Sequence, residues 1–416
     1  MKILYILLAI VILLILIMVH ELGHYLAGKL LKFKINEFSI GFGKAIYQKT
    51  LKSGEKFSLR IFPLGGYCSF DGEDEDKDAE GSFNKQAPWK RLIVLFSGVF
   101  FNFLFGVITS VIYLCMASYV QPQVLSIYDG NTNPFQVGDV IVAVDGKKLD
   151  YYKISSDTLV QFSNKISKYD ENEEFVVTVL RDGKKENITV SKQAREPYRY
   201  VLNAKGILDN GYYKDADDNY VKFTTEEEAY NYLHNTSNEL TSVYRYNEET
   251  GEYLPYAEDV IKELCQITIS DAGVSLGILQ TYHYTRYNFG QALIYAVPFC
   301  LDVCWLLLAC LGGLFTGATK VSDLGGTVTA VSQIAELTAI DFRYIFYLIP
   351  LISMNLALFN ILPIPALDGA RMVFVLIEWI FKKPVNRNVE GYIHFFGLIA
   401  LLALVVFLDI YHFFIL

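Results

Sequence analysis

The sequence has no excess of positive charge and no paired cysteine motif. Its 36 lysines and arginines are outnumbered by 45 aspartates and glutamates, so the net charge is −9. It therefore offers no basic stripe with interleaved aromatic residues, and we do not expect nucleic acid as a partner. None of the six cysteines stands in a C-x-x-C pair, and most lie in apolar segments. This indicates buried thiols, because a disulfide framework or a cysteine zinc site needs regular spacing.

Apolar residues dominate the composition. They make up 52% of the 416 residues, and the mean hydropathy is +0.28, too apolar for an ordinary soluble protein. A membrane span needs about 20 apolar residues. Residues 3–26, 91–119, 343–380 and 391–414 meet this need, and 291–315 is also apolar enough. We expect a polytopic α-helical membrane protein whose first segment is retained as a span, because it lacks a small-residue cleavage site.

The first apolar segment ends in an H-E-x-x-H pattern, His20-Glu21-Leu22-Gly23-His24. Two histidines four residues apart lie on one face of a helix and can bind one zinc ion. The glutamate beside the first histidine can activate a water molecule. The alternative is that these residues cap the wet end of a membrane helix. Ionisable residues at the margin of a span are costly, which favours a zinc hydrolase site.

A third ligand is expected from the segment 343–380. Asp368 follows an apolar helix that two prolines interrupt, so it is either a helix-boundary cap or a buried metal ligand. A hydrolytic zinc takes three protein ligands and keeps one position for water. We expect His20, His24 and Asp368 to be those ligands.

The distribution of charge predicts the orientation in the membrane. Loop 29–90 is rich in lysine, and three cations cluster at 382–387. By the positive-inside rule both regions are cytoplasmic, so both termini are extracytoplasmic. Asp368 must reach the depth of the histidines, which a crossing at 291–315 would prevent. We therefore expect 291–315 to lie along the outer membrane surface, leaving about four spans.

Two strand-like runs follow the first span. Residues 38–46 and 57–62 flank a turn at 52–55, which predicts a β-hairpin beside the metal site. Its free edge could hold a peptide by strand addition. A plain cytoplasmic hairpin fits the pattern equally well.

Residues 136–147 read Q-V-G-D-V-I-V-A-V-D-G-K and predict a strand with a tight turn, and 175–190 predict a hairpin. The V-G-D-x-I-x-x-V-x-G core resembles a PDZ domain, although the stretch before it departs from the usual G-S-P-A lead-in.

Residues 203–271 are acidic and rich in tyrosine. A helix start at 225–228, a possible hairpin at 244–253 and a second helix at 257–265 favour a small inserted subdomain over a disordered acidic loop.

Five motifs occur in a familiar order: H-E-L-G-H, F-S-I-G-F-G-K (38–44), P-L-G-G-Y (63–67), F-N-K-Q-A-P-W-K-R (83–91) and N-I-L-P-I-P-A-L-D-G (360–369). With them the chain resembles the site-2 protease family of intramembrane zinc metalloproteases, specifically the bacterial sigma-E-regulating type with an extracytoplasmic PDZ domain. The resemblance covers nearly all of the chain except 203–271. One departure is Ala370, where the family usually has a second glycine.

The resemblance implies roles for particular residues. His20, His24 and Asp368 would hold Zn2+, and Glu21 would act as the general base. Asn355 and Asn360 match asparagines that contact the substrate backbone, and their alternative role is hydrogen bonding between membrane helices.

The resemblance also implies substrates with one span, such as anti-sigma factors or signal-peptide remnants, cleaved in the bacterial cytoplasmic membrane during regulated intramembrane proteolysis. The competing functions are a non-catalytic PDZ membrane scaffold and a zinc hydrolase acting on lipid. The intact Glu21 argues against the first, and the hairpin edge and the PDZ-like region argue for a peptide over a lipid.

The expected fold is therefore a polytopic α-helical membrane protein with a cytoplasmic hairpin and an extracytoplasmic PDZ-like domain that carries an α/β insertion. The expected order is a first transmembrane helix (1–28), the hairpin with an acidic loop (29–90), a second transmembrane helix (91–119), the PDZ-like domain (120–202), the insertion (203–271), the end of the PDZ-like domain with a membrane-surface segment (272–342), a third transmembrane segment (343–380), and a cytoplasmic loop with the fourth helix (381–416).

Overall fold

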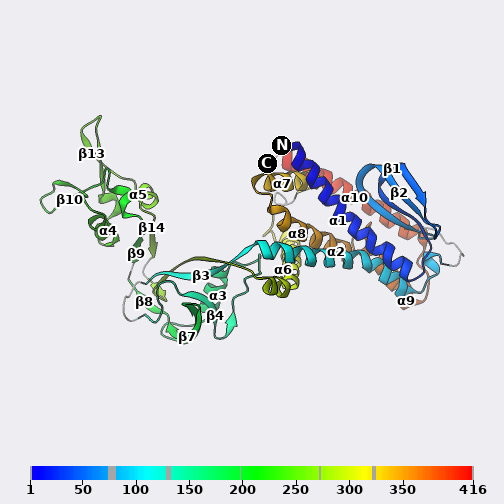
Figure 1. Ribbon diagram of the computed structural model, residues 1–416, viewed down its shortest axis with the longest axis horizontal. Helices are drawn as coiled ribbons and strands as arrows, with labels where there is room; N and C mark the ends of the chain where they lie inside the picture. Colours follow the sequence, from blue (N-terminus) through cyan, green and yellow to red (C-terminus); the bar gives the residue numbers. More distant parts are fainter. Residues whose placement is uncertain are drawn as a thin grey trace. The chain divides into compact units, whose positions relative to one another are not determined.

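The structure is a computed structural model that describes residues 2–73, 81–127, 133–196, 198–270, 273–320 and 325–414 (Figure 1). Residues 74–80 of the expected acidic loop lie outside the described residues. The chain divides into two compact units. Unit 1 holds Met1–Tyr119, Tyr152–Ser155 and Arg286–Leu416, and unit 2 holds Val120–Tyr151 and Ser156–Thr285.

Unit 1 is built from apolar helices. Among the described residues, five helices are long and apolar enough to cross a membrane: α1 (Lys2–Leu30), α2 (Pro88–Met116), α6 (Phe289–Thr316), α8 (Tyr344–Ile361) and α10 (Arg387–Phe414). Shorter helices complete the unit: η1 (Phe83–Lys85), α7 (Thr327–Ile340) and α9 (Asp368–Phe381). The expected third span is thus two helices, α8 and α9, separated at the two prolines.

Local sequence explains where these helices begin and end. Helix α2 has Pro88 in its first turn, where the missing amide hydrogen costs nothing. Helix α6 begins with a capping box, in which Asn288 and Gln291 each accept a hydrogen bond from the other's backbone amide. It ends at Gly317, whose positive φ of 76° suits a glycine.

The predicted hairpin is present, with long strands β1 (Ile35–Thr50) and β2 (Lys56–Phe70). Gly54 supplies the positive φ of its turn, at 98°. The hairpin is bent, because Phe38 of β1 is aligned with both Cys68 and Phe57 of β2. The first half of β1 therefore lies between two stretches of β2.

Helices α1, α2 and α8 pack through small residues. A Cβ atom on Gly23 of α1 would overlap the carbonyl oxygen of Ser97 on α2, and one on Gly106 would overlap Met354 of α8. Small residues let membrane helices approach closely, where lipid gives no hydrophobic drive for association. The hydroxyl of Ser353 also donates a hydrogen bond to the carbonyl of Asn102, at 2.7 Å.

Unit 2 begins with a sheet in the strand order β16-β3-β4-β6-β7, with β5 beside β4. Its strands are β3 (Ser118–Ile127), β4 (Val140–Val144), β5 (Lys147–Lys148), β6 (Glu174–Arg181), β7 (Lys184–Ser191) and β16 (Ile278–Arg286), and its helix is α3 (Thr158–Ile166). Ile141, Phe162, Val177 and Val179 are central to the core. The predicted hairpin is β6 and β7, with a turn at Asp182 and Gly183, which both have positive φ.

The acidic insertion is folded around a core of its own. The helix start predicted at Thr225 is α4, and Thr225 caps it by accepting a hydrogen bond from the Glu228 amide. The predicted hairpin is β12 and β13, and the second predicted helix is α5. The elements between β7 and β16, which include those of the insertion, are β8 (Gln193–Arg195), β9 (Tyr198–Val201), η2 (Ala204–Ile207), β10 (Tyr212–Lys214), β11 (Tyr220–Lys222), α4 (Glu226–His234), η3 (Leu240–Ser242), β12 (Tyr244–Asn247), β13 (Glu252–Pro255), α5 (Glu258–Leu264), β14 (Ile267–Ser270) and β15 (Gly273–Ser275).

The V-G-D core of unit 2 has a structural explanation. Gly138 has a φ of 95°, and the side chain of Asp139 is almost fully buried. Arg181 on β6 donates two hydrogen bonds to this carboxylate, from Nε at 2.8 Å and from Nη2 at 2.7 Å. The backbone amide of Gln136 donates a third at 2.8 Å. The fork geometry of arginine matches a carboxylate, so this pair locks the β4 turn to β6.

Removing Asp139 should strongly destabilise unit 2. Asp139→Ala leaves Arg181 without its buried partner, and we expect a loss of about 3 kcal/mol. Glu186→Gln is the matched control, because Glu186 contacts the same arginine at 2.9 Å but is exposed, and surface pairs contribute below about 1 kcal/mol. Limited proteolysis at increasing urea concentrations would measure the stability of unit 2 in both variants. Equal resistance of the two would contradict this assignment of the V-G-D aspartate.

Candidate metal centre

Three side chains predicted as metal ligands meet inside unit 1. His20 and His24 lie one turn apart on α1, and Asp368 is the first residue of α9. Asp368 Oδ2 is 2.9 Å from His20 Nε2 and 3.2 Å from His24 Nε2, and the two nitrogens are 3.1 Å apart. Both histidines are more than nine-tenths buried.

This triangle fits a zinc ion. Zinc bonds of about 2.1 Å at tetrahedral angles hold neighbouring ligand atoms about 3.4 Å apart. The three measured separations, 2.9 to 3.2 Å, are close to that spacing. Two imidazoles and one carboxylate also form a donor set typical of hydrolytic zinc, with the fourth position left for water.

Helix α2 orients both histidines through contacts to their Nδ1 atoms, on the side of each ring away from the triangle. The carbonyl oxygen of Val94 is 2.8 Å from His24 Nδ1, so this ring donates there and turns Nε2 toward the triangle. The amide of Asn102 lies 3.2 Å from His20 Nδ1. Asn102 is fully buried, and its Oδ1 has no hydrogen-bond partner among the described residues. A metal on Nε2 requires a proton on Nδ1, and turning the amide lets Oδ1 accept it.

Gly98 on α2 makes room for the imidazoles. A Cβ atom at this position would lie 2.5 Å from His24 Nε2 and 2.7 Å from His20 Cε1. The histidine rings therefore pack directly against the α2 backbone. The sequence analysis did not identify the role of α2 in this site. The feature that could have revealed it is Asn102, a polar residue within an apolar span.

The turn before α9 fixes the position of Asp368. Ala366 has a φ of 78°, a left-handed conformation that costs a non-glycine residue of order 1 kcal/mol or more. His394 on α10 accepts a hydrogen bond from the Ala366 amide at 3.0 Å and so supports this turn. Gly369 is also sterically required, because a Cβ atom there would overlap the carbonyl oxygen of Leu362.

Glu21 lies beside the triangle and against the hairpin. The amide of Cys68 on β2 donates a hydrogen bond to the Glu21 carboxylate. Gly66 lets β2 pass close to α1, since a Cβ atom there would lie 3.8 Å from Glu21 Cγ and 2.9 Å from Met18 Sδ. The expected sheet is therefore next to the three clustered side chains.

A cavity of about 250 Å³ opens over these groups, lined by Ile17, His20, Glu21, Asn102, Leu356, Asn360, Ala366, Leu367 and Asp368. Asn360 faces it, and its side-chain amide donates to the Leu356 carbonyl at 2.9 Å. Asn355 is exposed and does not line it. Five residues rotate a helix by about 140° beyond a full turn, so the two asparagines face different sides of α8.

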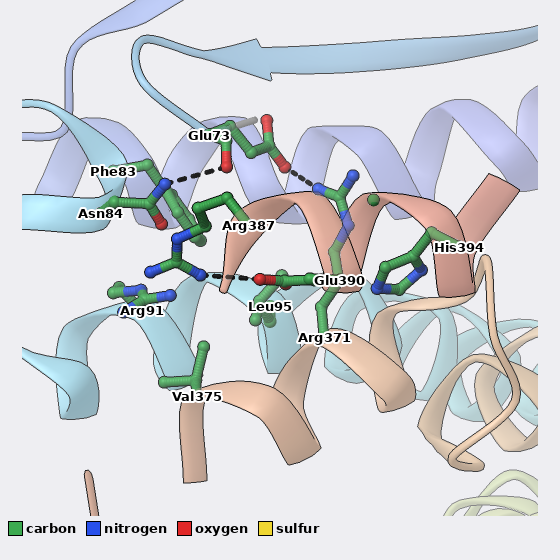
Figure 2. Close-up of a pocket in the computed structure, with 11 residues that line it drawn as sticks. Glu73, Phe83, Asn84, Arg91, Leu95, Arg371, Val375, Arg387, Glu390 and His394 are labelled. Atoms are coloured by element: carbon green, nitrogen blue, oxygen red, sulfur yellow. Dashed lines mark hydrogen bonds and ion pairs between the residues drawn. The ribbon is translucent and has the colours of Figure 1, made fainter. Parts of the chain in front are cut away.

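The far end of α9 is held by ion pairs of Glu378, and Figure 2 shows the neighbouring pairs Arg387–Glu390 and Arg371–Glu73. Glu378 binds Arg91 of α2 at 2.5 Å and Arg387 at the start of α10 at 2.7 Å. Arg387 also binds Glu390 at 2.7 Å. These side chains border a second cavity of about 260 Å³, where Arg371 pairs with Glu73. The charges are matched, so this cluster fastens α9 between its neighbours.

The family model described as Peptidase family M50 matches residues 8–404, almost the whole chain. The chain belongs to peptidase family M50. It is 26% identical over 410 residues to a protein of Fusobacterium nucleatum whose name describes a zinc metalloprotease, covering 97% of each chain. It is 25% identical over 438 residues to the "Regulator of sigma E protease" of Haemophilus influenzae, covering 94% of this chain and 95% of that one.

Membership of the M50 family confirms the resemblance to site-2 proteases inferred from the motifs. The protein is a zinc metalloprotease, and its cofactor is zinc. Its long apolar helices and its family identify it as a multi-pass membrane protein.

Asn102 should control zinc affinity. Asn102→Leu keeps a similar side-chain volume but removes the group that orients His20, so we expect zinc to bind about 10- to 100-fold more weakly. Ser110→Ala is the matched control, because Ser110 is equally buried on α2 but bonds to the Val107 carbonyl. Chelator competition on the purified proteins would measure both. Wild-type affinity in Asn102→Leu would show that His20 is oriented by other means.

Proposed function

We propose that this metalloprotease cleaves single-span membrane proteins or signal-peptide remnants inside the bacterial cytoplasmic membrane, in regulated intramembrane proteolysis. The observation that carries the proposal is the position of the clustered ligands. His20, His24 and Asp368 lie on apolar helices with Glu21 beside them and a β-hairpin against Glu21. This arrangement brings hydrolytic groups and a peptide-binding edge to one location within membrane helices.

In this proposal His20, His24 and Asp368 hold the zinc ion, with Asn102 and Val94 orienting the two histidines. A zinc ion held by these three residues would supply Lewis-acid chemistry: it would lower the pKa of the attacking water toward ~7 and offset negative charge on the attacked carbonyl. Glu21 acts as general base: it accepts the proton of the attacking water and then delivers it to the leaving amine. The Cys68 amide orients the carboxylate of Glu21.

The hairpin would present the substrate backbone. The stretch Gly66–Phe70 of β2 pairs with β1 along one side, and the Cys68 amide on its other side meets Glu21. A peptide extended along this second side would pass next to the general base. A transmembrane helix must unwind to be cut, because its carbonyls are engaged in internal hydrogen bonds. Asn360 faces the same cavity and would hold the freed backbone, whereas Asn355, to which the family resemblance gives a similar role, does not line this cavity and would contact the substrate only outside it.

We further propose that the first part of unit 2 is an extracytoplasmic PDZ-like domain. Its antiparallel sheet, the α3 helix and the turn at Gly138 and Asp139 support this proposal. A PDZ-like domain outside the membrane would restrict or recruit substrates before cleavage.

Substitutions at Glu21 and Asp368 should separate catalysis from metal binding. Glu21→Gln cannot accept the proton but leaves all three ligands, so it should keep zinc and lose nearly all cleavage. Asp368→Asn replaces an anionic ligand by a neutral one and should weaken zinc binding as well. Bound zinc and the accumulation of uncleaved single-span stubs in membranes would be measured for both. Near-normal cleavage by Glu21→Gln would end the assignment of Glu21 as base.

Four crossings are the topology we propose, with both termini extracytoplasmic and α6 not crossing. Tyr287, before α6, packs on Tyr119 with ring centroids 4.7 Å apart, and Tyr347, after α7, packs on Tyr113 at 5.3 Å. The segment 287–347 therefore starts and finishes beside the same end of α2. A segment that starts and ends at one end of a membrane helix makes no net crossing.

The contacts of Asp302 support the same topology. Asp302 is midway along α6, about 20 Å from its start, which in a crossing helix is near the bilayer centre. It accepts hydrogen bonds from the Ile154 amide at 2.9 Å and from the Ser155 amide and hydroxyl at 3.0 and 2.6 Å. Irregular backbone is disfavoured at the bilayer centre, where lipid cannot satisfy its polar groups. The contact with this loop therefore supports a position of the α6 midpoint at the membrane surface.

Cysteine labelling would test this topology. In a functional cysteine-depleted variant, Ala318→Cys should react with an impermeant thiol reagent on intact cells, and Pro384→Cys should not. The first position follows α6 and the second precedes α10. Labelling after permeabilisation is the control for accessibility of position 384. The opposite pattern would overturn both the proposed topology and the role of Asp368 as a zinc ligand.

A further inference from the structure

The net charge of the protein is concentrated in the insertion. Residues 203–271 hold 15 of the 45 acidic residues but only 5 of the 36 lysines and arginines, which gives this segment a net charge of −10. The remainder of the chain carries +1. A partner that approaches this segment therefore meets a strongly negative field, which favours cations.

One face of the sheet in this insertion is made of tyrosine. The strands run in the order β11-β10-β12-β13. Side chains alternate between the two faces, so Tyr213 points into the core and packs on Phe223 and Tyr232. The opposite face, which we call the tyrosine face, carries Tyr212, Tyr220, Tyr244, Tyr246 and Tyr253.

The five rings form a continuous contact surface. Tyr220 stacks on Tyr253 with centroids 4.0 Å apart and an interplanar angle of 8°. Tyr212 and Tyr246 each contact Tyr253 at 5.0 Å, and Tyr244 contacts Tyr220 at the same distance. None of the five belongs to the buried core of the insertion; Tyr220 is 36% exposed, and the other four are of intermediate exposure. The rings are therefore held by one another, and each keeps part of its surface accessible to a partner.

The tyrosine face already carries two lysines, because Lys214 and Lys222 lie directly opposite Tyr220 and Tyr212 in the sheet. Lys214 Nζ lies 5.3 Å from the ring centroid of Tyr220, within the range of a cation–π interaction. The turns at both ends of the face are acidic, with Asp215, Asp217 and Asp218 after β10 and Glu248 and Glu249 after β12. Aromatic faces bordered by carboxylates match the side chains of lysine and arginine, which offer both a charge and an apolar stem.

We propose that the tyrosine face binds an extended segment rich in lysine and arginine from another polypeptide. The rings receive the side-chain cations, and the acidic turns attract the segment from a distance. A neutral partner gains contact with the rings but nothing from the charge of −10. In the proposed topology the insertion is extracytoplasmic, so the partner is an extracytoplasmic chain or the external part of a membrane protein.

Direct binding to the full-length protein tests this. The protein in nanodiscs of neutral phosphatidylcholine would be titrated with a fluorescent Lys/Arg-rich peptide and a Glu-rich peptide of equal length. We expect only the basic peptide to bind, with affinity that falls as salt rises. Tyr220→Ala combined with Tyr253→Ala should weaken binding about tenfold, because it removes two of the rings that receive the cations.

Matched variants keep the test independent of folding. Tyr284→Ala removes a tyrosine that is 68% exposed on β16, outside the insertion, and should leave binding unchanged. Tyr220→Phe combined with Tyr253→Phe preserves the aromatic faces and should bind like wild type. Glu248→Gln combined with Glu249→Gln keeps the rings and should reduce the salt dependence.

Three results would overturn the proposal. The first is equal binding of the acidic and basic peptides, and the second is full binding by the double alanine variant. The third is binding of a neutral oligosaccharide, such as chitohexaose, by the wild type but not by the alanine variant, with no binding of the basic peptide. That result would make the tyrosine face a glycan platform.

Discussion

The convergence of three ligand atoms is the constraint on which the structure of unit 1 depends. Asp368 meets His20 across 348 residues of sequence, and all the atoms concerned are within 3.2 Å of one another. Such closeness requires nearly bare backbone at the contacts, which Gly23 and Gly98 provide between α1 and α2 and Gly369 provides between the start of α9 and the end of α8. Steric contact as well as polar groups therefore fixes α1 against α2 and the start of α9 against α8.

The sequence predicted the parts of this site that depend on local spacing. The two histidines and Glu21 follow from helical periodicity, and Asp368 follows from a break in an apolar segment. The hairpin, its turn at Gly54 and the helix start at Thr225 are also local patterns, and the structure contains each of them. These features are encoded within a few residues, so one sequence is enough to find them.

Other features depend on partners that are distant in the sequence. Asn102 is recognisable as a polar residue in a span, but its contact with His20 depends on how α1 and α2 pack. The support that His394 gives to the turn at Ala366 depends on the path of α10. Hydropathy likewise cannot locate Asp302 of α6, because its position is set by contact with a loop about 150 residues earlier in the sequence.

The ion pairs at the far end of α9 have a consequence for the metal. Glu378, which these ion pairs hold, is ten residues from Asp368, and the rigid helix α9 separates the two by about 15 Å. Zinc sites tolerate errors of about 0.2 Å in ligand distance. A tilt of about 1° around Glu378 moves Asp368 by that amount before side-chain torsions compensate. With Asp368 as a ligand, as proposed, the strength of zinc binding would depend on the orientation of α9, and a disturbance of the arginines around Glu378 would change it.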